Sequence, residues 1–252
     1  MQTPVQGAPA EPQSIRGVAD VASITRQRLL DEEGFHFFQA HVVHALLAAL
    51  AASFGGVFSC NTNKAELTVG YGTLYGDIAG FLAVIGDLWK EDVYALGNHL
   101  NTEVYGRELI PGGIFEVMPS AELSAEQAVD QGKGDPLIYP YHDRLFFSWV
   151  QKWNRATPEE ILGWYLEGSL KENLGLSANV DLKKHFPTPQ AFIADLERWW
   201  NLYNGIGVAK RVQAPPVLAV SSRAFGYDHR EFLGRSTYTQ RYLELKKKLL
   251  EK

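Results

Sequence analysis

The chain has 252 residues, of which 46% are hydrophobic and 21% are charged, so it is long enough and apolar enough to bury a large core. Its formal net charge of −5 argues against nucleic-acid binding, which usually needs a basic stripe, and its single cysteine excludes an internal disulfide. No apolar run approaches the roughly 20 residues of a membrane span, and the N-terminus lacks a signal-peptide pattern, so we expect a cytoplasmic protein that binds neither nucleic acid nor membranes.

The first quarter of the chain is predicted to hold a tail, a buried helix and a short strand. Residues 1–16 are rich in Pro, Gln and Ala without an apolar period and are typical of a disordered tail. A helical pattern extends from Val18 to Leu30. Apolar residues between Phe37 and Phe54 recur mostly at three- and four-residue spacing, which predicts a well-buried helix that ends at two glycines. Val57–Cys60 is then a candidate for a short buried strand.

The remainder of the chain is predicted to be mainly helical. A helix is expected from about Lys90 to Leu100, whereas residues 107–136 are non-periodic, as functional loops often are. Five of the six tryptophans lie between Trp149 and Trp200, which indicates a packed helical layer. Four helices are predicted in this half, two of which open with a Thr-Pro signal: Tyr139–Trp153, Thr157–Lys171, Thr188–Tyr203 and Tyr238–Lys252.

The segment Asn63–Asp77 combines acids, hydroxyls and three glycines soon after the predicted strand. In open α/β sheets, ligands gather outside the carboxyl ends of strands. A carboxylate at this place, that of Glu66, could hold Mg²⁺ between phosphate oxygens. From composition alone, the more common role of Glu66 would be to cap a helix after a polar loop. The three glycines form neither a P-loop nor a dinucleotide-binding motif.

Other polar residues have both a functional and a structural interpretation. Lys90 could bind a phosphate near the start of its helix, or it could be a solvated surface lysine. Ser120 could donate a hydrogen bond to a phosphate, or it could cap a short helix. Lys210 and Arg211 could grip a carboxylate or a phosphate, or they could be ordinary loop charges.

Two further features indicate packing rather than catalysis. His41 and His44 lie three positions apart on one predicted helix face, but the pattern places no third metal ligand near them. We therefore expect them to be hydrogen-bonded core histidines. Cys60 has no catalytic partner pattern, so we expect a buried small side chain.

Ordered motifs in the chain resemble the synthetase domain of glutamine-dependent NAD⁺ synthetases. The similarity runs from about Phe54 to the C-terminus, so residues 17–252 are expected to form the C-terminal portion of such a domain. The motifs that carry the resemblance are, in chain order, Asn63–Asp77 (NKAELTVGYGTLYGD), Leu88–Lys90 (LWK), Pro119–Leu123 (PSAEL), Lys210–Pro216 (KRVQAPP) and Arg223–Gly226 (RAFG).

The resemblance implies an ATP-dependent ligase of NAD biosynthesis. In that family, deamido-NAD⁺ is adenylylated on its nicotinate carboxylate with release of pyrophosphate. Ammonia, which can come from glutamine, then displaces AMP to give NAD⁺. Mg²⁺ and cationic side chains screen the repulsion between the two polyanionic substrates. The family's synthetase domains typically dimerise, so a homodimer is implied as well.

The resemblance also carries ligand roles over to seven residues, without assigning a catalytic residue. The positions that correspond to ATP-binding residues are Asn61, Lys90 and Ser120. The positions that correspond to deamido-NAD⁺-binding residues are Glu66, Asp77, Lys210 and Arg211, and Glu66 is also at the family's Mg²⁺ position.

The sequence departs from the family pattern near its start. It has no Ser-Gly-Gly-x-Asp-Ser loop, which in the family cradles pyrophosphate and supplies a metal-binding aspartate. The region before residue 35 is too short for the strand–helix units that normally precede this domain portion. The family's Glu-Asn-x-Gln-Ala-Arg helix start corresponds to His36–His41 (HFFQAH). Histidine in place of that arginine would lose a charge-assisted interaction of about 1.5–3 kcal/mol. The amidohydrolase domain that makes ammonia from glutamine is absent as well.

Three interpretations follow from this combination. The chain is a truncated or split NAD⁺ synthetase that works only with a missing N-terminal subunit, a non-catalytic binding or assembly subunit, or an enzyme of another class that reuses the site. We favour the first, and a separate glutaminase is a further candidate partner. The expected fold class is α/β: a partial adenine-nucleotide alpha-hydrolase-like (Rossmann-type) domain, mostly helical with one to three parallel strands. Its strand Val57–Cys60 would have an exposed edge that needs a partner.

Overall fold

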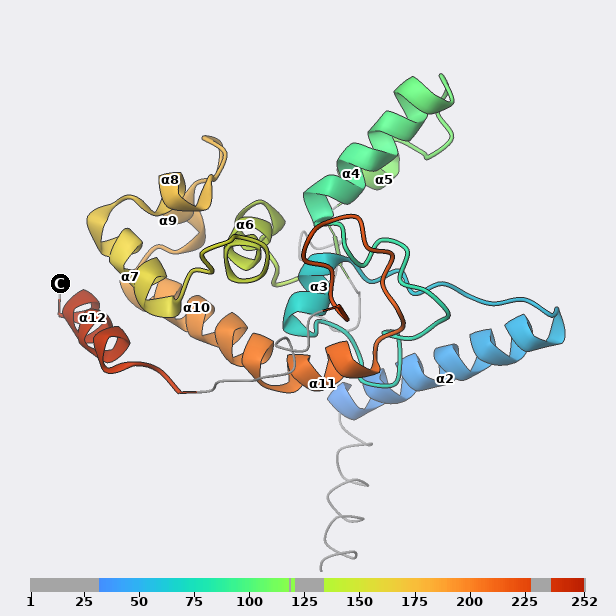
Figure 1. Cartoon of the computed structure of the whole chain (residues 1–252), viewed down its shortest axis with the longest axis horizontal. Coiled ribbons are helices and arrows are strands. Elements are labelled where there is room, and N and C mark those ends of the chain that lie inside the picture. The colour runs from blue at the N-terminus through green and yellow to red at the C-terminus, as the bar shows by residue number, and fades with distance from the viewer. Residues whose placement is uncertain (1–31, 118, 121–133, 228–236, 252) are drawn as a thin grey trace, which may run out of the picture.

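The computed structural model describes residues 32–117, 119–120, 134–227 and 237–251. The tail predicted at 1–16 and the helix predicted at Val18–Leu30 lie outside these residues. Figure 1 shows a layer of helices on one side of the molecule. On the other side, shorter helices and extended segments lie beside one long helix.

The helical layer predicted from the tryptophans is present. Trp149 and Trp199 are fully buried in the core of this layer, and their rings lie among other aromatic rings. Because large rings bury the most apolar area per residue, they account for much of its stability. The helices of this half are α6 (Tyr139–Val150), α7 (Pro158–Glu167), α8 (Leu170–Leu174), α9 (Leu182–His185), α10 (Pro189–Asn204), α11 (Ile206–Gln213) and α12 (Gln240–Leu250).

Local capping signals set the ends of these helices. The Thr188 hydroxyl accepts a hydrogen bond of 3.2 Å from the backbone N–H of Ala191, which caps α10 as the Thr-Pro signal predicts. Glu160 accepts a hydrogen bond of 2.9 Å from the backbone N–H of Thr157 at the start of α7. The helix predicted to continue to Lys171 instead ends at Gly168, whose φ of 76° lies in the left-handed region. The chain therefore breaks into α7 and α8.

A series of buried hydrogen bonds links α6 to α10. The backbone N–H of Ile138 donates a hydrogen bond of 2.7 Å to Nδ1 of His142, so Nε2 of this ring carries the proton in the neutral tautomer. Nε2 lies 3.0 Å from an Asp195 oxygen, and the second oxygen of Asp195 accepts a hydrogen bond of 2.9 Å from Nε1 of Trp199. These contacts satisfy the buried imidazole.

The long helix α2 (Glu32–Ser53) forms as predicted, but the expectation that it is well buried is wrong. Phe38 and Leu46 are each 58% exposed, and Phe54, just beyond the helix, is 84% exposed. His41 is exposed too, which corrects the expectation of a core histidine, and His44 packs edge-on against the Phe58 ring. Apolar periodicity shows that a helix has an apolar face, and the described residues do not cover this one.

The predicted strand Val57–Cys60 is wrong as a strand, because the described residues contain only isolated parallel bridges. Cys60 bridges Ala83, and Ala83 bridges Val217. Backbone hydrogen bonds of 2.8 Å support both pairings, from Phe81 N to Phe58 O and from Ala83 N to Pro216 O. Cys60 is buried, as expected. The pairing among these segments is thus parallel, as expected. However, the described residues form isolated bridges and no sheet.

Short helices follow two of the bridged segments. Asn63 caps α3 (Lys64–Val69), which ends at Gly70 with φ of 67°. A Cβ atom at Gly70 would lie 2.8 Å from the Gly207 Cα, so α3 and α11 approach closely at a pair of glycines. The helix predicted from Lys90 is confirmed as α4 (Lys90–His99), which continues into the π-helix η1 (Leu100–Val104). The short helix α5 (Gly113–Glu116) follows. None of the described helices has the length and apolarity needed to cross a membrane.

Candidate functional site

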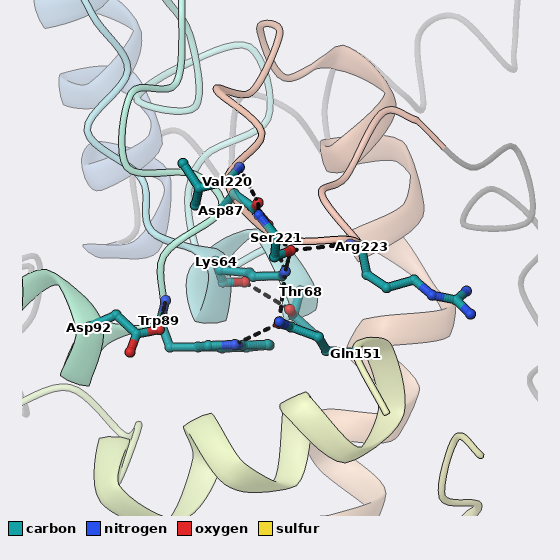
Figure 2. A network of polar contacts seen from close by, with 9 residues as sticks. All are labelled: Lys64, Thr68, Asp87, Trp89, Asp92, Gln151, Val220, Ser221 and Arg223. Carbon is teal, nitrogen blue, oxygen red and sulfur yellow. Dashed lines mark hydrogen bonds and ion pairs between the residues drawn. The ribbon is translucent and has the colours of Figure 1, made fainter. Parts of the chain in front are cut away.

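Polar side chains gather where the three bridged segments end. Lys64, Asp87 and Ser221 each come four positions after a bridge residue, so the parallel pairing delivers them to the same edge. Ligands in α/β proteins bind at this carboxyl edge. In Figure 2 the three side chains converge above α6.

A buried ion pair forms the centre of this group. Lys64 Nζ lies 2.6 Å from an Asp87 oxygen, and both side chains are 0% exposed. The same ammonium donates hydrogen bonds of 2.9 Å to the Ser221 hydroxyl and 3.0 Å to the Gln151 side chain. The second Asp87 oxygen accepts hydrogen bonds from the backbone N–H groups of Val220 (2.8 Å) and Ser221 (2.5 Å). We call Lys64, Asp87 and Ser221 the hub.

The hub keeps the Asp87 carboxylate ionised. Burial alone raises the pKa of this group, but the hydrogen bond from Lys64 and the two backbone donors outweigh it, so the pKa of Asp87 is lowered overall. Trp89 packs against the hub. The Lys64 ammonium lies 5.3 Å from the centre of the Trp89 ring, and the indole N–H of Trp89 donates a hydrogen bond of 3.0 Å to Gln151.

A second group, which we call the acidic cluster, consists of Glu66, Asp135, Tyr71, Tyr139 and Lys90. The Tyr139 hydroxyl lies 3.3 Å from an oxygen of Glu66 and 3.3 Å from an oxygen of Asp135. The Tyr71 hydroxyl donates a hydrogen bond of 3.1 Å to the other Asp135 oxygen. One phenol thus joins the two carboxylates.

Glu66 caps the start of α3 with one oxygen and faces the acidic cluster with the other. One of its oxygens accepts a hydrogen bond of 2.9 Å from Asn63 N, and Asn63 in turn accepts one of 3.0 Å from Glu66 N. This capping box confirms the structural role. The other oxygen faces Tyr139 in the acidic cluster. Burial raises the pKa of Glu66, the Asn63 N–H and the Lys90 charge lower it, and the net shift is upward.

Two of the residues expected to bind ATP lie at the acidic cluster. The Lys90 ammonium lies 5.3 Å from the centre of the Tyr139 ring and 5.6 Å from that of Tyr94. Ser120 lies beside Asp135, because the backbone N–H of Asp135 donates a hydrogen bond of 2.9 Å to Pro119 O. The structure therefore places Lys90 near Glu66, and Ser120 next to a residue that is bound to Asp135. The segment that Ser120 could cap lies outside the described residues.

The remaining predicted site residues lie elsewhere. Lys210 donates a hydrogen bond of 2.8 Å to Gly70 O, and its pKa is lowered by burial despite the opposing charge of Asp77. Asp77 is exposed and accepts a hydrogen bond from Thr73 N in its own loop. Asn61 is exposed and accepts one of 3.0 Å from the Ser59 hydroxyl.

Arg211 is buried and its guanidinium group joins two helix ends. It donates hydrogen bonds to Thr68 O near the end of α3 and, at 2.8 Å, to Tyr203 O near the end of α10. A cation at the C-terminal end of a helix is stabilised by the helix dipole. The Arg211 side chain also lies over the rings of Tyr203 and Phe225, so it packs as part of the core.

The acidic cluster contains two carboxylates that could hold Mg²⁺ together with a ligand. Within the described ranges, no group of three or more His, Cys, Asp or Glu side chains could hold a metal ion by itself. Mg²⁺ usually takes one or two carboxylates and shares the remaining positions with water and substrate phosphates. Glu66 and Asp135, joined through one hydroxyl, fit that requirement.

Several residues of these groups were not predicted as site residues. Asp135 lies in the non-periodic segment 107–136, whose length was the only signal for it. Nothing in the sequence pattern marked Tyr71 and Tyr139 as site residues, because single tyrosines are common both in hydrophobic cores and in functional sites. Lys64 was not predicted as a site residue, because its pairing with Asp87 depends on contacts across 23 residues of sequence.

Comparison with known proteins shows the family of the chain. A family model described as NAD synthase matches residues 18–171. The chain belongs to this family. It is 35% identical over 192 residues to the glutamine-dependent NAD(+) synthetase of Thermotoga maritima, a match that covers 76% of this chain and 28% of that protein. It is 36% identical over 112 residues to the NH(3)-dependent NAD(+) synthetase of Trichlorobacter lovleyi, covering 44% and 37%.

The match to larger relatives covers only part of their length. The chain spans 30% of the glutamine-dependent NAD(+) synthetase of a Synechocystis strain, at 34% identity over 202 residues, or 80% of this chain. A crystal structure of the glutamine-dependent NAD(+) synthetase from Cytophaga hutchinsonii aligns with 94% of this chain and 33% of that chain, with a TM-score of 0.50 and 15% identity. This likeness shows the fold alone.

Proposed function

We propose that the chain supplies part of the site of an ATP-dependent NAD⁺ synthetase, which converts deamido-NAD⁺ to NAD⁺ through an adenylate. The observation that carries this proposal is the acidic cluster. Glu66 and Lys90, two residues of the family's motifs, come together with Asp135 at the carboxyl edge of the parallel-bridged segments. A cation next to a carboxylate pair suits a triphosphate that carries a divalent ion.

The residues of the cluster would act mainly by binding and positioning. The Lys90 ammonium would contact the phosphates of ATP, with Ser120 donating a hydrogen bond to them and Asn61 lying nearer the nucleoside. Glu66 and Asp135 would hold Mg²⁺. Mg²⁺ when bound screens the charge of the phosphates and favours the departure of pyrophosphate.

The second group of predicted residues would take deamido-NAD⁺. Lys210 and Asp77 line the loop after α3, while Arg211 holds the ends of α3 and α10. Adenylylation of the nicotinate carboxylate replaces a poor leaving group with AMP, which ammonia then displaces. The amide nitrogen comes from ammonia, and one proton is released.

One feature supports a requirement for a partner. Large apolar side chains of α2 are exposed in the described part of the chain. We propose that a second polypeptide covers this surface, either a second copy of the chain or an N-terminal subunit of the synthetase, and that a glutaminase supplies ammonia. A cytoplasmic location belongs to the same proposal.

A second candidate is a binding or assembly subunit without catalysis. The same exposed α2 face favours it, since large apolar patches on soluble proteins mark interaction sites. The two candidates differ in whether nucleotide reaches the acidic cluster at all.

The deciding assay combines the purified chain with ATP, Mg²⁺, deamido-NAD⁺ and ammonium, and measures NAD⁺ with a coupled dehydrogenase. ATP binding is measured in parallel by equilibrium dialysis, with Lys90→Met as the site variant. Lys152→Met is the matched control, because Lys152 is a partly buried lysine that donates to Asn173 O, away from the cluster.

Each outcome selects one candidate. NAD⁺ formation by the chain alone would show that it needs no partner for the reaction. ATP binding that Lys90→Met weakens, without turnover, supports a synthetase that needs its partner. No ATP binding would refute the synthetase proposal and leave the assembly subunit.

A further inference from the structure

Burying the charged Lys64–Asp87 pair in the protein core has a large desolvation cost. Both side chains are 0% exposed, and removing two charges from water costs several kcal/mol for each ion before their attraction offsets it. Buried pairs of this kind can often be replaced by apolar residues without loss of stability. Stability alone is therefore a weak explanation for this pair.

The position of the pair in the chain suggests another explanation. Lys64 is the first residue of α3 and comes two residues before Glu66. Asp87 comes three residues before Lys90, the first residue of α4. A backbone hydrogen bond of 2.9 Å from Lys64 N to Leu88 O ties the same two segments a second time. The pair therefore joins the starts of the two helices that carry Glu66 and Lys90.

The third hub residue fastens this junction to a distant segment. Ser221 donates a hydrogen bond of 2.9 Å to Asp87 and accepts one from Lys64, while its own N–H binds the other Asp87 oxygen. Arg223 N adds a hydrogen bond of 3.2 Å to the Ser221 hydroxyl. All three Lys64 donors are thereby used within the protein, so this ammonium is committed to structure rather than to a ligand.

We propose that Lys64 and Asp87 are positioning residues that hold Glu66 and Lys90 at the spacing that binds a magnesium-bound nucleoside triphosphate. The ligand in this inference rests on the proposed function, whereas the positioning is a property of the unliganded chain. An ion pair suits this task because charge and hydrogen-bond geometry fix its partners more narrowly than apolar contacts do. Small displacements of binding groups have large effects on ligand affinity.

The test uses a charge-free replacement of similar shape, Lys64→Met combined with Asp87→Asn. The asparagine keeps an oxygen that can accept from the N–H groups of Val220 and Ser221. The matched control is Lys246→Met with Glu197→Gln, which removes an ion pair of 2.5 Å between α12 and α10, where the side chains are 31% and 24% exposed. Hydrogen exchange and MgATP affinity are measured for both double variants and for the wild-type chain.

Positioning predicts that exchange accelerates at residues 61–70 and 86–94 in the Lys64–Asp87 variant, and that MgATP affinity falls at least tenfold. The control variant should leave both unchanged. Ser221→Ala, which removes one hydroxyl, covers the case in which the double variant does not fold. It should accelerate exchange in the same segments and weaken MgATP binding about threefold.

The proposal is overturned if exchange in both segments stays at the wild-type rate in folded variants, or if it accelerates without any loss of MgATP affinity. If the wild-type chain binds no MgATP, the proposed function and the ligand named here are both refuted. In that case the exchange rates of the unliganded chains alone decide whether the pair positions the two helix starts.

Discussion

Asp143 is a buried carboxylate that should make the stability of the chain depend on pH. It lies on α6 and is 2% exposed. One of its oxygens accepts a hydrogen bond of 3.0 Å from Glu91 N in the first turn of α4. Its other oxygen is buried without a hydrogen-bond partner among the described residues. Burial, together with the nearby charges of Glu91 and Asp92 and against the backbone donors, raises the pKa of Asp143 to about 7.

The magnitude follows from this shift. Because the folded state holds the proton more tightly than the unfolded state, the free energy of unfolding falls as pH rises from about 4 to about 7. A shift from 3.8 to about 7 corresponds to roughly 4 kcal/mol as an upper limit. Asp143→Asn stays neutral at every pH and keeps an oxygen for Glu91 N. The variant should therefore match the wild type near pH 4 and be more stable, by about 1–4 kcal/mol, at pH 8.

The assay is urea unfolding followed by tryptophan fluorescence at pH 4 to 8, since Trp149 and Trp199 are buried in the helical layer. Glu244→Gln, on the exposed face of α12, is the control and should show no comparable pH dependence. A stability difference between Asp143→Asn and wild type that is the same at pH 4 and pH 8 would refute the reasoning.

Three further substitutions test other contacts. Lys64→Met leaves Asp87 buried without its cation and should lower the free energy of unfolding by about 3–5 kcal/mol; a loss below about 1 kcal/mol in urea unfolding contradicts the buried pair. Gly70→Ala puts a Cβ atom 2.8 Å from the Gly207 Cα at a residue with φ of 67°. It should lower the free energy of unfolding by about 1–3 kcal/mol in urea unfolding, and an unchanged free energy rules out the close contact. Lys90→Met should weaken MgATP binding about tenfold, or about 1.4 kcal/mol, in equilibrium dialysis without changing the urea midpoint; unchanged affinity removes Lys90 from the site.

Features with local causes could be predicted from the sequence. The start of α10 depends on Thr188 and the proline after it, and α4 begins at Lys90 as predicted. The capping role of Glu66 depends on Asn63 three residues earlier. These contacts lie within one helical turn, so the residue pattern contains the information needed to predict them.

Features that depend on distant contacts could not be predicted in the same way. The apolar pattern of α2 was correct, but its burial depends on a cover that the described residues do not provide. Val57 was assigned to a strand because of its apolar neighbours, whereas only Cys60 forms a bridge, across to Ala83. The acidic cluster likewise needs Tyr139 to reach Glu66 across 73 residues of sequence.

The hub also has a consequence for the order of folding. The N–H of Ser221 binds Asp87 across 134 residues, a span that contains α4 and most of the helical layer. Closing so long a loop costs more entropy than forming a helix or a local turn, so these contacts form late. During synthesis, α3 and α4 leave the ribosome long before residue 221 exists. If the pair positions Glu66 and Lys90 as proposed, these residues reach their final spacing only after residue 221 has been made.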